Sequence, residues 1–490
     1  MKSAFGRLAR QSGLYALSNI LIKASGLLLA PLYLDPSLLT VESFGHLVTL
    51  EATAQLAIPL IGLGLATGLV RFLTAPEHED QHATIPFTTF ALIAVLAALA
   101  FAALWLLAPV ASRAILSGPE RADLFRWIGA YIALKVVASV PFMLIRTQER
   151  AGLYVVATVA EAALLIGGVY YFLGLHRMGL EGVLRAYVAS AGASALVLSG
   201  GMLAVVRWRF HLPLAWKLLR FSAPLAIAGI ALPILHVGDR YLLEWLSTTE
   251  ELAVYGWAAR LSGVLNMLVV QSFQLAFLVV GLKALGGTGG GALHRRVFRH
   301  YTIWAGYVVV GLTLLAYDVT AWISADAVYL AAAPEVFPLS LGYLAYGFYT
   351  ISVNVMYATS RPGAVAVAVS GGALVNLALN AVLIPPLGGM GAAIATLVAY
   401  AFLAVSITRS ADQSLDAGFP WRTLATVLVI IVALWAAAQP AYGWSVPARL
   451  GWLAALIVAY PVLVRVTGLY SRDEVRTALR WIGERLRTTP

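Results

Sequence analysis

The sequence contains no cysteine and very little charge. Among its 490 residues there is not one Cys, which excludes disulfides, thiol nucleophiles and thiolate metal sites. Asp, Glu, Lys and Arg make up 11% of the chain, where a soluble domain carries about 25%. Hydrophobic residues make up 61%, and a water-soluble fold cannot cover that much apolar surface. A soluble enzyme is therefore excluded.

Catalytic and cofactor-binding motifs are also missing. We find no HExxH, GxSxG or GxxxxGK[ST] pattern and no dinucleotide fingerprint, and the eight His show no metal-ligand spacing. We therefore expect no enzymatic activity, no cofactor and no metal site.

The chain consists of long apolar runs separated by Pro, Gly and charge clusters. A membrane-spanning helix needs about 20 apolar residues, so these runs predict about fourteen spans in an all-α membrane protein. The first run shows no cleavage pattern, so we interpret it as a membrane helix and not as a removed signal peptide. The predicted helices cover residues 9–34, 42–70, 84–112, 123–147, 151–174, 179–206, 217–246, 250–283, 296–323, 326–358, 363–385, 389–408, 420–438 and 446–468.

Lys and Arg are distributed unevenly between the two sides that these spans define. Of the 33 Lys and Arg, 23 fall on the side of the termini and five on the opposite side. Because cytoplasmic loops are enriched in Lys and Arg, we expect both termini in the cytoplasm, in a multi-pass protein of the cell inner membrane. The net charge of +10 then serves orientation and contact with anionic lipids, so we expect no nucleic-acid partner.

A repeat of about 210 residues can be followed by eye. ESFGHL around Gly45 resembles AVYGWA around Gly256, and TQERAGLY at Arg150 resembles ATSRPGAV at Arg361, both at an offset of 211 residues. Six helices separate equivalent points, which keeps the two copies in the same orientation, as in parallel-repeat transporters. We predict two parallel lobes around a central cavity: a six-helix lobe over 1–210, a second over 211–412, and two additional helices with a cytoplasmic tail over 413–490.

Several cations lie inside the predicted spans, where a charge costs at least ~2.5 kcal/mol unless it faces protein or water. They are Lys23 in the first helix, Lys135 in the fourth and Arg260 in the eighth, with Gln271 and Gln274 further along the face of Arg260. Such cations can hold a diphosphate through charge-assisted hydrogen bonds. We predict that these five residues line a water-filled cavity.

A polar and aromatic stripe runs along the tenth predicted helix. Its members follow one another at steps of three or four residues: Tyr343, Tyr346, Thr350, Asn354 and Tyr357. Tyrosine rings and amides suit the apolar and polar sides of a sugar, so Tyr346 and Asn354 are further candidates for substrate binding. The tyrosines can equally serve packing or an interfacial belt.

Carboxylates inside the spans are candidates for ion coupling, which requires a group that changes its charge during transport. Glu51 and Glu161 are the deepest, and Asp239 is the third candidate. The sequence leaves open whether a coupling ion exists and whether it is sodium or a proton.

Structural roles remain open for most of these residues. Lys23 can pair with Glu51, and Lys135 with Glu161, between neighbouring helices. Intrahelical pairs are expected for Arg240 with Glu244 and for Arg185 with Glu181, and interhelical hydrogen bonds for Asn376 and Asn380.

Several segments of the chain resemble a known family. They are RQSGLYALSNILIKASGLLLAPLYLDPSLLTVESFGHL, then GLGLATGLVRFL, and later GDRYLLEWLSTTEELAVYGWAARL. They are similar to polysaccharide biosynthesis membrane proteins, the lipid-linked oligosaccharide flippases of the multidrug/oligosaccharidyl-lipid/polysaccharide (MOP) exporter superfamily. As topology, two six-helix lobes plus two helices, the likeness extends over the whole chain.

The resemblance implies that the protein moves an undecaprenyl-diphosphate-linked glycan from the inner to the outer leaflet by alternating access. It also implies that cavity cations bind the diphosphate, a role that falls by position on Lys23 and Arg260. A related branch that flips the peptidoglycan precursor concentrates arginines in the first two helices. Here the first helix has only Lys23 and Arg71 ends the second, which argues against that cargo.

From the sequence we therefore predict a flippase for a polyprenyl-diphosphate-linked oligosaccharide, acting as a monomer among membrane lipids. The first alternative is an ion-coupled multidrug or metabolite exporter of the same superfamily, which would favour a cavity rich in carboxylates and poor in cations. The second is a membrane-embedded glycan polymerase, which would need a long extracytoplasmic loop.

Overall fold

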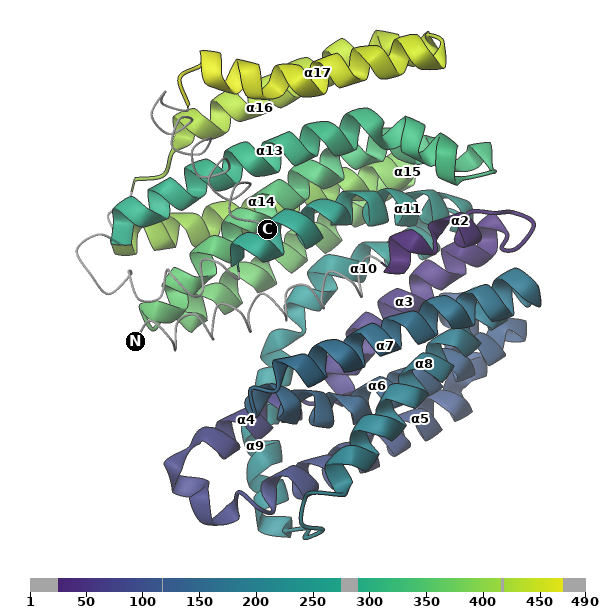
Figure 1. Cartoon of the computed structure of the whole chain (residues 1–490), viewed down its shortest axis with the longest axis vertical. Coiled ribbons are helices and arrows are strands. Elements are labelled where there is room, and N and C mark those ends of the chain that lie inside the picture. Colours follow the sequence, from purple (N-terminus) through teal and green to yellow (C-terminus); the bar gives the residue numbers. More distant parts are fainter. Residues whose placement is uncertain (1–24, 117, 275–289, 416–417, 470–490) are drawn as a thin grey trace, which may run out of the picture.

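The protein is built from membrane-length helices. The computed structural model describes residues 25–116, 118–274, 290–415 and 418–469, and this part of the chain holds no strand (Figure 1). The predicted all-α class is confirmed, since eleven of the described helices are long and apolar enough to cross a membrane. On α5 (Ile85–Ile115), Leu99, Leu106 and Val110 are 63 to 76% exposed, as expected of side chains that face lipid.

The N-terminal half of the chain forms one group of helices, coloured purple to teal in Figure 1. In this group α9 packs against α4 and α5, and α10 (Ala231–Leu246) lies between this group and the next, against both α3 and α15. The other members are α2 (Ala30–Tyr33), α3 (Val41–Ile61), α4 (Leu65–Thr74), α6 (Ala122–Thr147), α7 (Ala151–Val169), α8 (Gly179–Leu203) and α9 (Leu212–Gly229).

The C-terminal half forms the second group, coloured teal to yellow in Figure 1. Its last two helices pack against each other and against α13 at the edge of the group. The members are α11 (Thr249–Leu265), α13 (Gly290–Ile323), α14 (Ala333–Ala358), α15 (Pro362–Leu415), α16 (Trp421–Ala438) and α17 (Val446–Val466).

The observed helices differ from the predicted limits in three places. The predicted helix 42–70 is divided into α3 and α4 by a turn at 62–64. The predicted helices 363–385 and 389–408 form one continuous ribbon, α15, with a break at Gly388, whose φ of +53° favours glycine. The predicted helix 217–246 is divided into α9 and α10. If α15 counts as two spans and α9 with α10 as one, the described residues provide thirteen of the fourteen predicted spans. Most of the first, 9–34, lies outside the described residues.

The loops at the repeat landmark Arg150 and Arg361 have the same backbone conformation. Glu149 and Ser360, which precede them, have φ of +55° and +56°. Each arginine N–H then donates to the carbonyl five residues earlier, at 3.1 and 2.8 Å, as in a helix end with a left-handed residue. This equivalence at an offset of 211 residues supports the repeat, while the lobe boundaries at 210 and 412 stay predictions.

The second landmark pair, Gly45 and Gly256, lies where α3 crosses α11. A Cβ on Gly45 would lie 2.4 Å from the carbonyl oxygen of Thr249, and a Cβ on Gly256 would lie 2.5 Å from Cγ2 of Val48. Each glycine therefore lets the other helix approach its backbone. We call this contact the α3/α11 crossing; at this end the two groups of helices touch directly.

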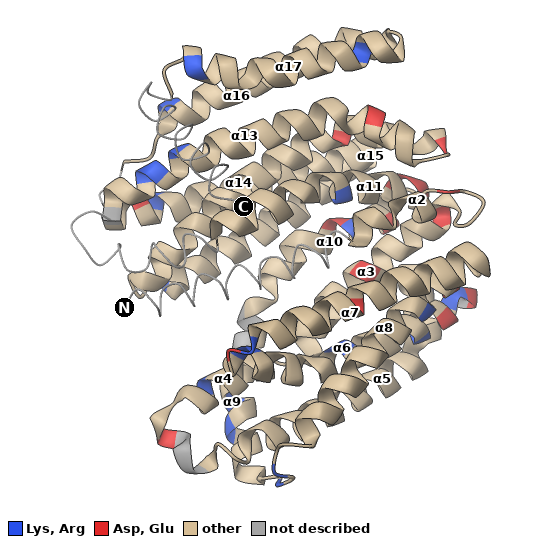
Figure 2. Cartoon of the chain, in the orientation of Figure 1, with Lys and Arg blue, Asp and Glu red and all other residues tan. Residues whose placement is uncertain are grey.

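Charged residues gather at the two ends of the helices (Figure 2). Blue residues are frequent near α4, α9 and the start of α13, whereas red ones are frequent near α2 and the start of α11. The basic end is the one that the Lys and Arg count assigns to the cytoplasm. The sidedness itself stays a prediction.

We predict that Gly45→Ala destabilises the protein, because the added methyl overlaps backbone atoms of Thr249 that cannot move without shifting α11. Overpacking of this kind costs about 1–3 kcal/mol, which should lower the melting temperature measured by circular dichroism in detergent. The control is Gly311→Ala on α13, where a Cβ would meet no heavy atom within 4 Å. Equal melting temperatures for the two variants would contradict the close crossing.

Candidate functional site

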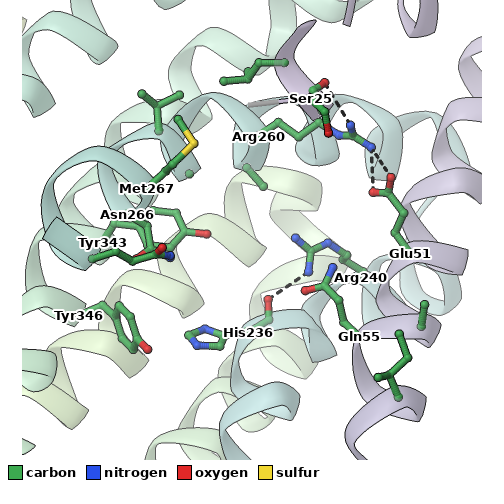
Figure 3. A pocket seen from close by; sticks show the side chains of 18 of the residues that line it. Ser25, Glu51, Gln55, His236, Arg240, Arg260, Asn266, Met267, Tyr343 and Tyr346 are labelled. Atoms are coloured by element: carbon green, nitrogen blue, oxygen red, sulfur yellow. Dashed lines mark hydrogen bonds and ion pairs between the residues drawn. The ribbon is translucent and has the colours of Figure 1, made fainter. Parts of the chain in front are cut away.

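A cavity of about 700 Å³ lies between the two groups of helices. Both groups contribute to its wall, through α3, α6 and α8 on one side and α11 and α14 on the other, with α10 between them. Figure 3 shows polar side chains that point into the cavity from opposite sides. Its polar and aromatic lining residues are Ser25, Glu51, Gln55, Tyr131, Tyr187, His236, Arg240, Arg260, Asn266, Gln271, Gln274, Tyr343 and Tyr346.

Arg260 on α11 reaches the cavity next to the α3/α11 crossing. Its Nη2 donates to both carboxylate oxygens of Glu51 on α3, at 2.9 and 2.8 Å (Figure 3). The Tyr187 hydroxyl donates to Glu51 Oε1 at 2.5 Å. The guanidinium also lies over the rings of Tyr33 and Phe44, 5.4 and 5.2 Å from their centroids, a favourable cation–π geometry. Arg260, predicted to bind phosphate, is thus paired with Glu51, one of the carboxylates predicted for ion coupling.

Arg240 on α10 is the second guanidinium in the wall, and the pair predicted for it is wrong. Its Nη1 donates to the backbone carbonyl of His236 at 3.0 Å, and its side chain faces the cavity. Glu244 is turned toward Thr49 and Thr249, whose hydroxyls donate to its carboxylate. The two threonines thus provide hydrogen-bond donors to the Glu244 carboxylate in place of Arg240. Within the described parts of the chain, no carboxylate lies at ion-pair distance from Arg240.

An aromatic wall from α10 and α14 stands beside the guanidinium groups. His236 Nδ1 lies 2.5 Å from the Tyr400 hydroxyl, and the rings of His236 and Tyr346 pack edge to face with centroids 5.0 Å apart. Tyr343 lines the same wall, and the predicted glutamines Gln271 and Gln274 lie in the wall as well. Aromatic faces and amides next to guanidinium groups can bind a sugar that is linked to a phosphate.

Two predicted substrate residues, Lys135 and Asn354, lie outside the lining of this cavity. Lys135 on α6 pairs with Glu161 on α7 at 2.6 Å, and neither residue belongs to the lining. The two charges neutralise each other between neighbouring helices, so neither needs to face water. Asn354 is 5% exposed and donates to the carbonyl of Thr350 on its own helix. Lys23 lies outside the described residues.

Asp239 on α10 is buried next to Arg240 and beside several hydroxyl and amide groups. The hydroxyls of Tyr255 and Thr396 both donate to its Oδ2, and Asn376 donates in turn to Thr396 at 3.5 Å. Asn380 follows Asn376 by one turn on α15. Among the described side chains, three buried oxygens here accept no hydrogen bond: Oδ1 of Asp239, of Asn376 and of Asn380. Buried oxygens without a donor are unusual, and oxygen atoms are the ligands of alkali and alkaline-earth cations.

The sequence reasoning missed Arg240, His236 and Tyr187. A signal existed for the first two, because they are four residues apart and therefore share a face of α10. However, Glu244 follows Arg240 at the same spacing, and this spacing predicted an ion pair between those two residues instead. No signal existed for Tyr187, since its partner Glu51 is 136 residues away in the sequence.

The sequence profile of the polysaccharide biosynthesis protein family matches residues 8–278, more than half of the chain. The chain belongs to this family, so the resemblance read from the sequence is confirmed. No protein of curated function matches the chain.

Solved structures with a similar fold are transporters. The lipid II flippase MurJ, in an inward closed conformation, matches with a TM-score of 0.76 at 12% identity, over 94% of this chain and 98% of that one. An inward-facing multidrug resistance MATE family transporter of the MOP superfamily matches at 0.64 and 15%, over 83% and 95%. A MOP superfamily transporter from Pyrococcus furiosus matches at 0.62 and 12%, over 84% and 96%. The chain therefore has the fold of the MOP transporters.

We predict that the cavity is filled with water. In the cysteine-free chain, Gln55→Cys and Gln271→Cys should react with a charged methanethiosulfonate reagent, because both side chains line the cavity. Ala97→Cys, at a position that is 1% exposed, should stay unmodified. Mass spectrometry measures the modification. Unreactive cysteines at both cavity positions would show that water does not enter.

Proposed function

We propose that this member of the polysaccharide biosynthesis protein family is a flippase. It would carry a polyprenyl-diphosphate-linked oligosaccharide from the inner to the outer leaflet of the cytoplasmic membrane. The observation that carries the proposal is the presence of two guanidinium groups, Arg240 and Arg260, in one polar cavity between two groups of membrane helices. A guanidinium stays charged at physiological pH and binds phosphate oxygens through two parallel hydrogen bonds.

The charge of the cavity favours an anionic headgroup. Arg260 is neutralised by Glu51, whereas Arg240 donates to a backbone carbonyl. The two arginines and the glutamate among the described lining residues therefore leave a positive charge, partly balanced by the buried Asp239 that precedes Arg240. The attraction of a charge for an anion is stronger beside apolar helices than in bulk water. The diphosphate of a lipid-linked glycan offers two adjacent anionic groups to the two arginines.

The remaining wall suits the first sugars of the cargo. Tyr343 and Tyr346 offer ring faces and hydroxyls, and Gln55, Gln271 and Gln274 offer amides. The cavity volume falls within the range of about 300–1,000 Å³ that is usual for small-molecule sites. It can therefore hold the diphosphate with its first sugars, while the apolar polyprenyl tail remains in the lipid.

Movement of the two groups of helices would give alternating access. They touch at the α3/α11 crossing, and a rocking motion that parts this contact would open the cavity at that end. One chain contains both groups, so we propose a monomer. We also place the basic end of the helices and both termini in the cytoplasm.

An ion-coupled exporter of organic cations is the second candidate, because a MATE family transporter has a similar fold. The described cavity wall argues against it. Its carboxylate, Glu51, is already bonded to Arg260 and Tyr187, which leaves little negative charge to hold a cation.

We assign ion coupling to Asp239. The other two candidates, Glu51 and Glu161, are paired with Arg260 and Lys135. Asp239 instead shares its surroundings with amide and hydroxyl oxygens, the kind of ligands that a sodium ion takes. It directly precedes Arg240, so a cation bound there would change the electrostatic potential in the cavity.

Removing the cavity arginines should weaken binding of pyrophosphate, the headgroup fragment. A charge-assisted hydrogen bond contributes about 1.5–3 kcal/mol, so Arg240→Gln and Arg260→Gln should each raise the Kd about 10- to 100-fold in calorimetry on the purified protein. The double variant should also abolish surface glycan in cells that depend on this protein.

The control for this experiment is Arg185→Gln, which breaks an exposed pair with Glu181 away from the cavity and should bind as the unmodified protein does. Unchanged pyrophosphate affinity in both cavity variants would refute the diphosphate site. Tighter binding of an organic cation such as tetraphenylphosphonium would favour the exporter.

Asp239→Asn should remove the response to sodium. A cation that binds only the folded protein raises its melting temperature by linkage, so sodium at constant ionic strength should stabilise the unmodified protein. The effect should be absent in Asp239→Asn and retained in Asp318→Asn, whose carboxylate pairs with Arg449 far from the cluster. An equal sodium response in both variants would contradict the assignment.

A further inference from the structure

The guanidinium that the proposed function places on the diphosphate already holds an anion. Arg260 and Glu51 come from different groups of helices, and Nη2 of the arginine contacts both carboxylate oxygens. A phosphate group would present its oxygens to the same N–H donors. The carboxylate and the cargo therefore compete for one site.

This pair lies where the cavity ends. Phe44–Leu50 on α3 and the stretch 252–259 on α11 are buried on the side of the α3/α11 crossing. Glu51 and Arg260 are the first polar side chains of α3 and α11 beyond these stretches that face the cavity (Figure 3). The ion pair therefore joins the two groups of helices immediately beside their direct contact.

The two partners are held to different degrees. Arg260 lies against the rings of Tyr33 and Phe44, and its Nη1 is 3.5 Å from the carbonyl oxygen of Gly26. None of these contacts depends on the carboxylate, so the guanidinium can keep its place when the carboxylate leaves.

Glu51 has room to leave. Its side chain is 24% exposed in the cavity, and the Tyr187 hydroxyl remains as a second partner. In the Arg449–Asp318 pair between α17 and α13, by contrast, the side chains are only 9 and 12% exposed and lie outside the cavity lining. That pair is sealed, whereas the cavity pair is open to exchange with a solute anion.

We propose that Glu51 is an exchangeable counter-ion of Arg260, bound to it without cargo and displaced by the diphosphate. The inference rests on the proposed function and adds a residue that sets its specificity, because an anion that cannot displace the carboxylate is not carried. Displacement also breaks a charged contact between α3 and α11. Binding of cargo therefore favours the state in which the crossing is open.

The test is Glu51→Gln, which keeps the shape of the side chain and removes its charge. Without the competing carboxylate, pyrophosphate should bind roughly tenfold more tightly than to the unmodified protein in calorimetry. Asp318→Asn is the matched control, because it removes the carboxylate of the sealed pair and should leave the Kd unchanged. A purely structural pair would lose thermal stability in Glu51→Gln without any gain in affinity.

The outcomes separate this inference from the function on which it rests. If Arg260→Gln weakens pyrophosphate binding and Glu51→Gln does not strengthen it, the exchange is refuted and the diphosphate site stands. If neither Arg240→Gln nor Arg260→Gln changes the affinity, the diphosphate site is refuted and the exchange falls with it.

A distance measurement tests the opening. Spin labels at Glu120→Cys and Ala325→Cys in the cysteine-free chain report on this end of the crossing. Arg121, next to the first label, pairs with Glu42 of α3, and Ser324, next to the second, donates to the carbonyl of Leu34 before α3. Pyrophosphate should shift the distances upward in the labelled protein, and Glu51→Gln should show the shift without pyrophosphate. An unshifted distribution in Glu51→Gln would refute the link to opening.

Discussion

A charge among membrane helices is tolerated only if it is paired or faces water, and this constraint explains the arrangement around the cavity. Lys135 with Glu161 and Arg449 with Asp318 are neutralised between neighbouring helices. Arg260 is neutralised as well, but by a partner from the other half of the chain. Where a bond of this kind crosses an aqueous space, its strength depends on whatever anion enters that space.

The same two helices provide both the direct contact between the two groups and the ion pair beside it. Gly45 and Gly256 lack a side chain at the α3/α11 crossing, so the two helices approach closely there. Within two turns of the crossing, Glu51 and Arg260 enter the cavity wall. The charged pair therefore lies next to the direct contact between the two groups of helices.

The fold alone does not decide the cargo, because a lipid II flippase and MATE transporters share it. The distinction lies in the side chains that face the cavity. Two arginines with one bonded glutamate favour an anion, and the tyrosines and glutamines beside them suit a glycan. Asp239, which directly precedes Arg240, is buried beside the hydroxyls of Tyr255 and Thr396.

Hydrophobic runs determined the membrane class and the positions of most helices, because each span is specified by its own local composition. The repeat at Gly45 and Gly256 was visible for the same reason, and so were the candidates Arg260, Gln271, Gln274 and Tyr346. Which charges meet was decided only by packing, since Glu51 and Arg260 are 209 residues apart. Helical spacing predicted that Glu244 pairs with Arg240, but in the structure its carboxylate accepts hydrogen bonds from threonines of α3 and α11. Local sequence determines which face of a helix is polar, whereas the packing of all helices determines which residues that face contacts.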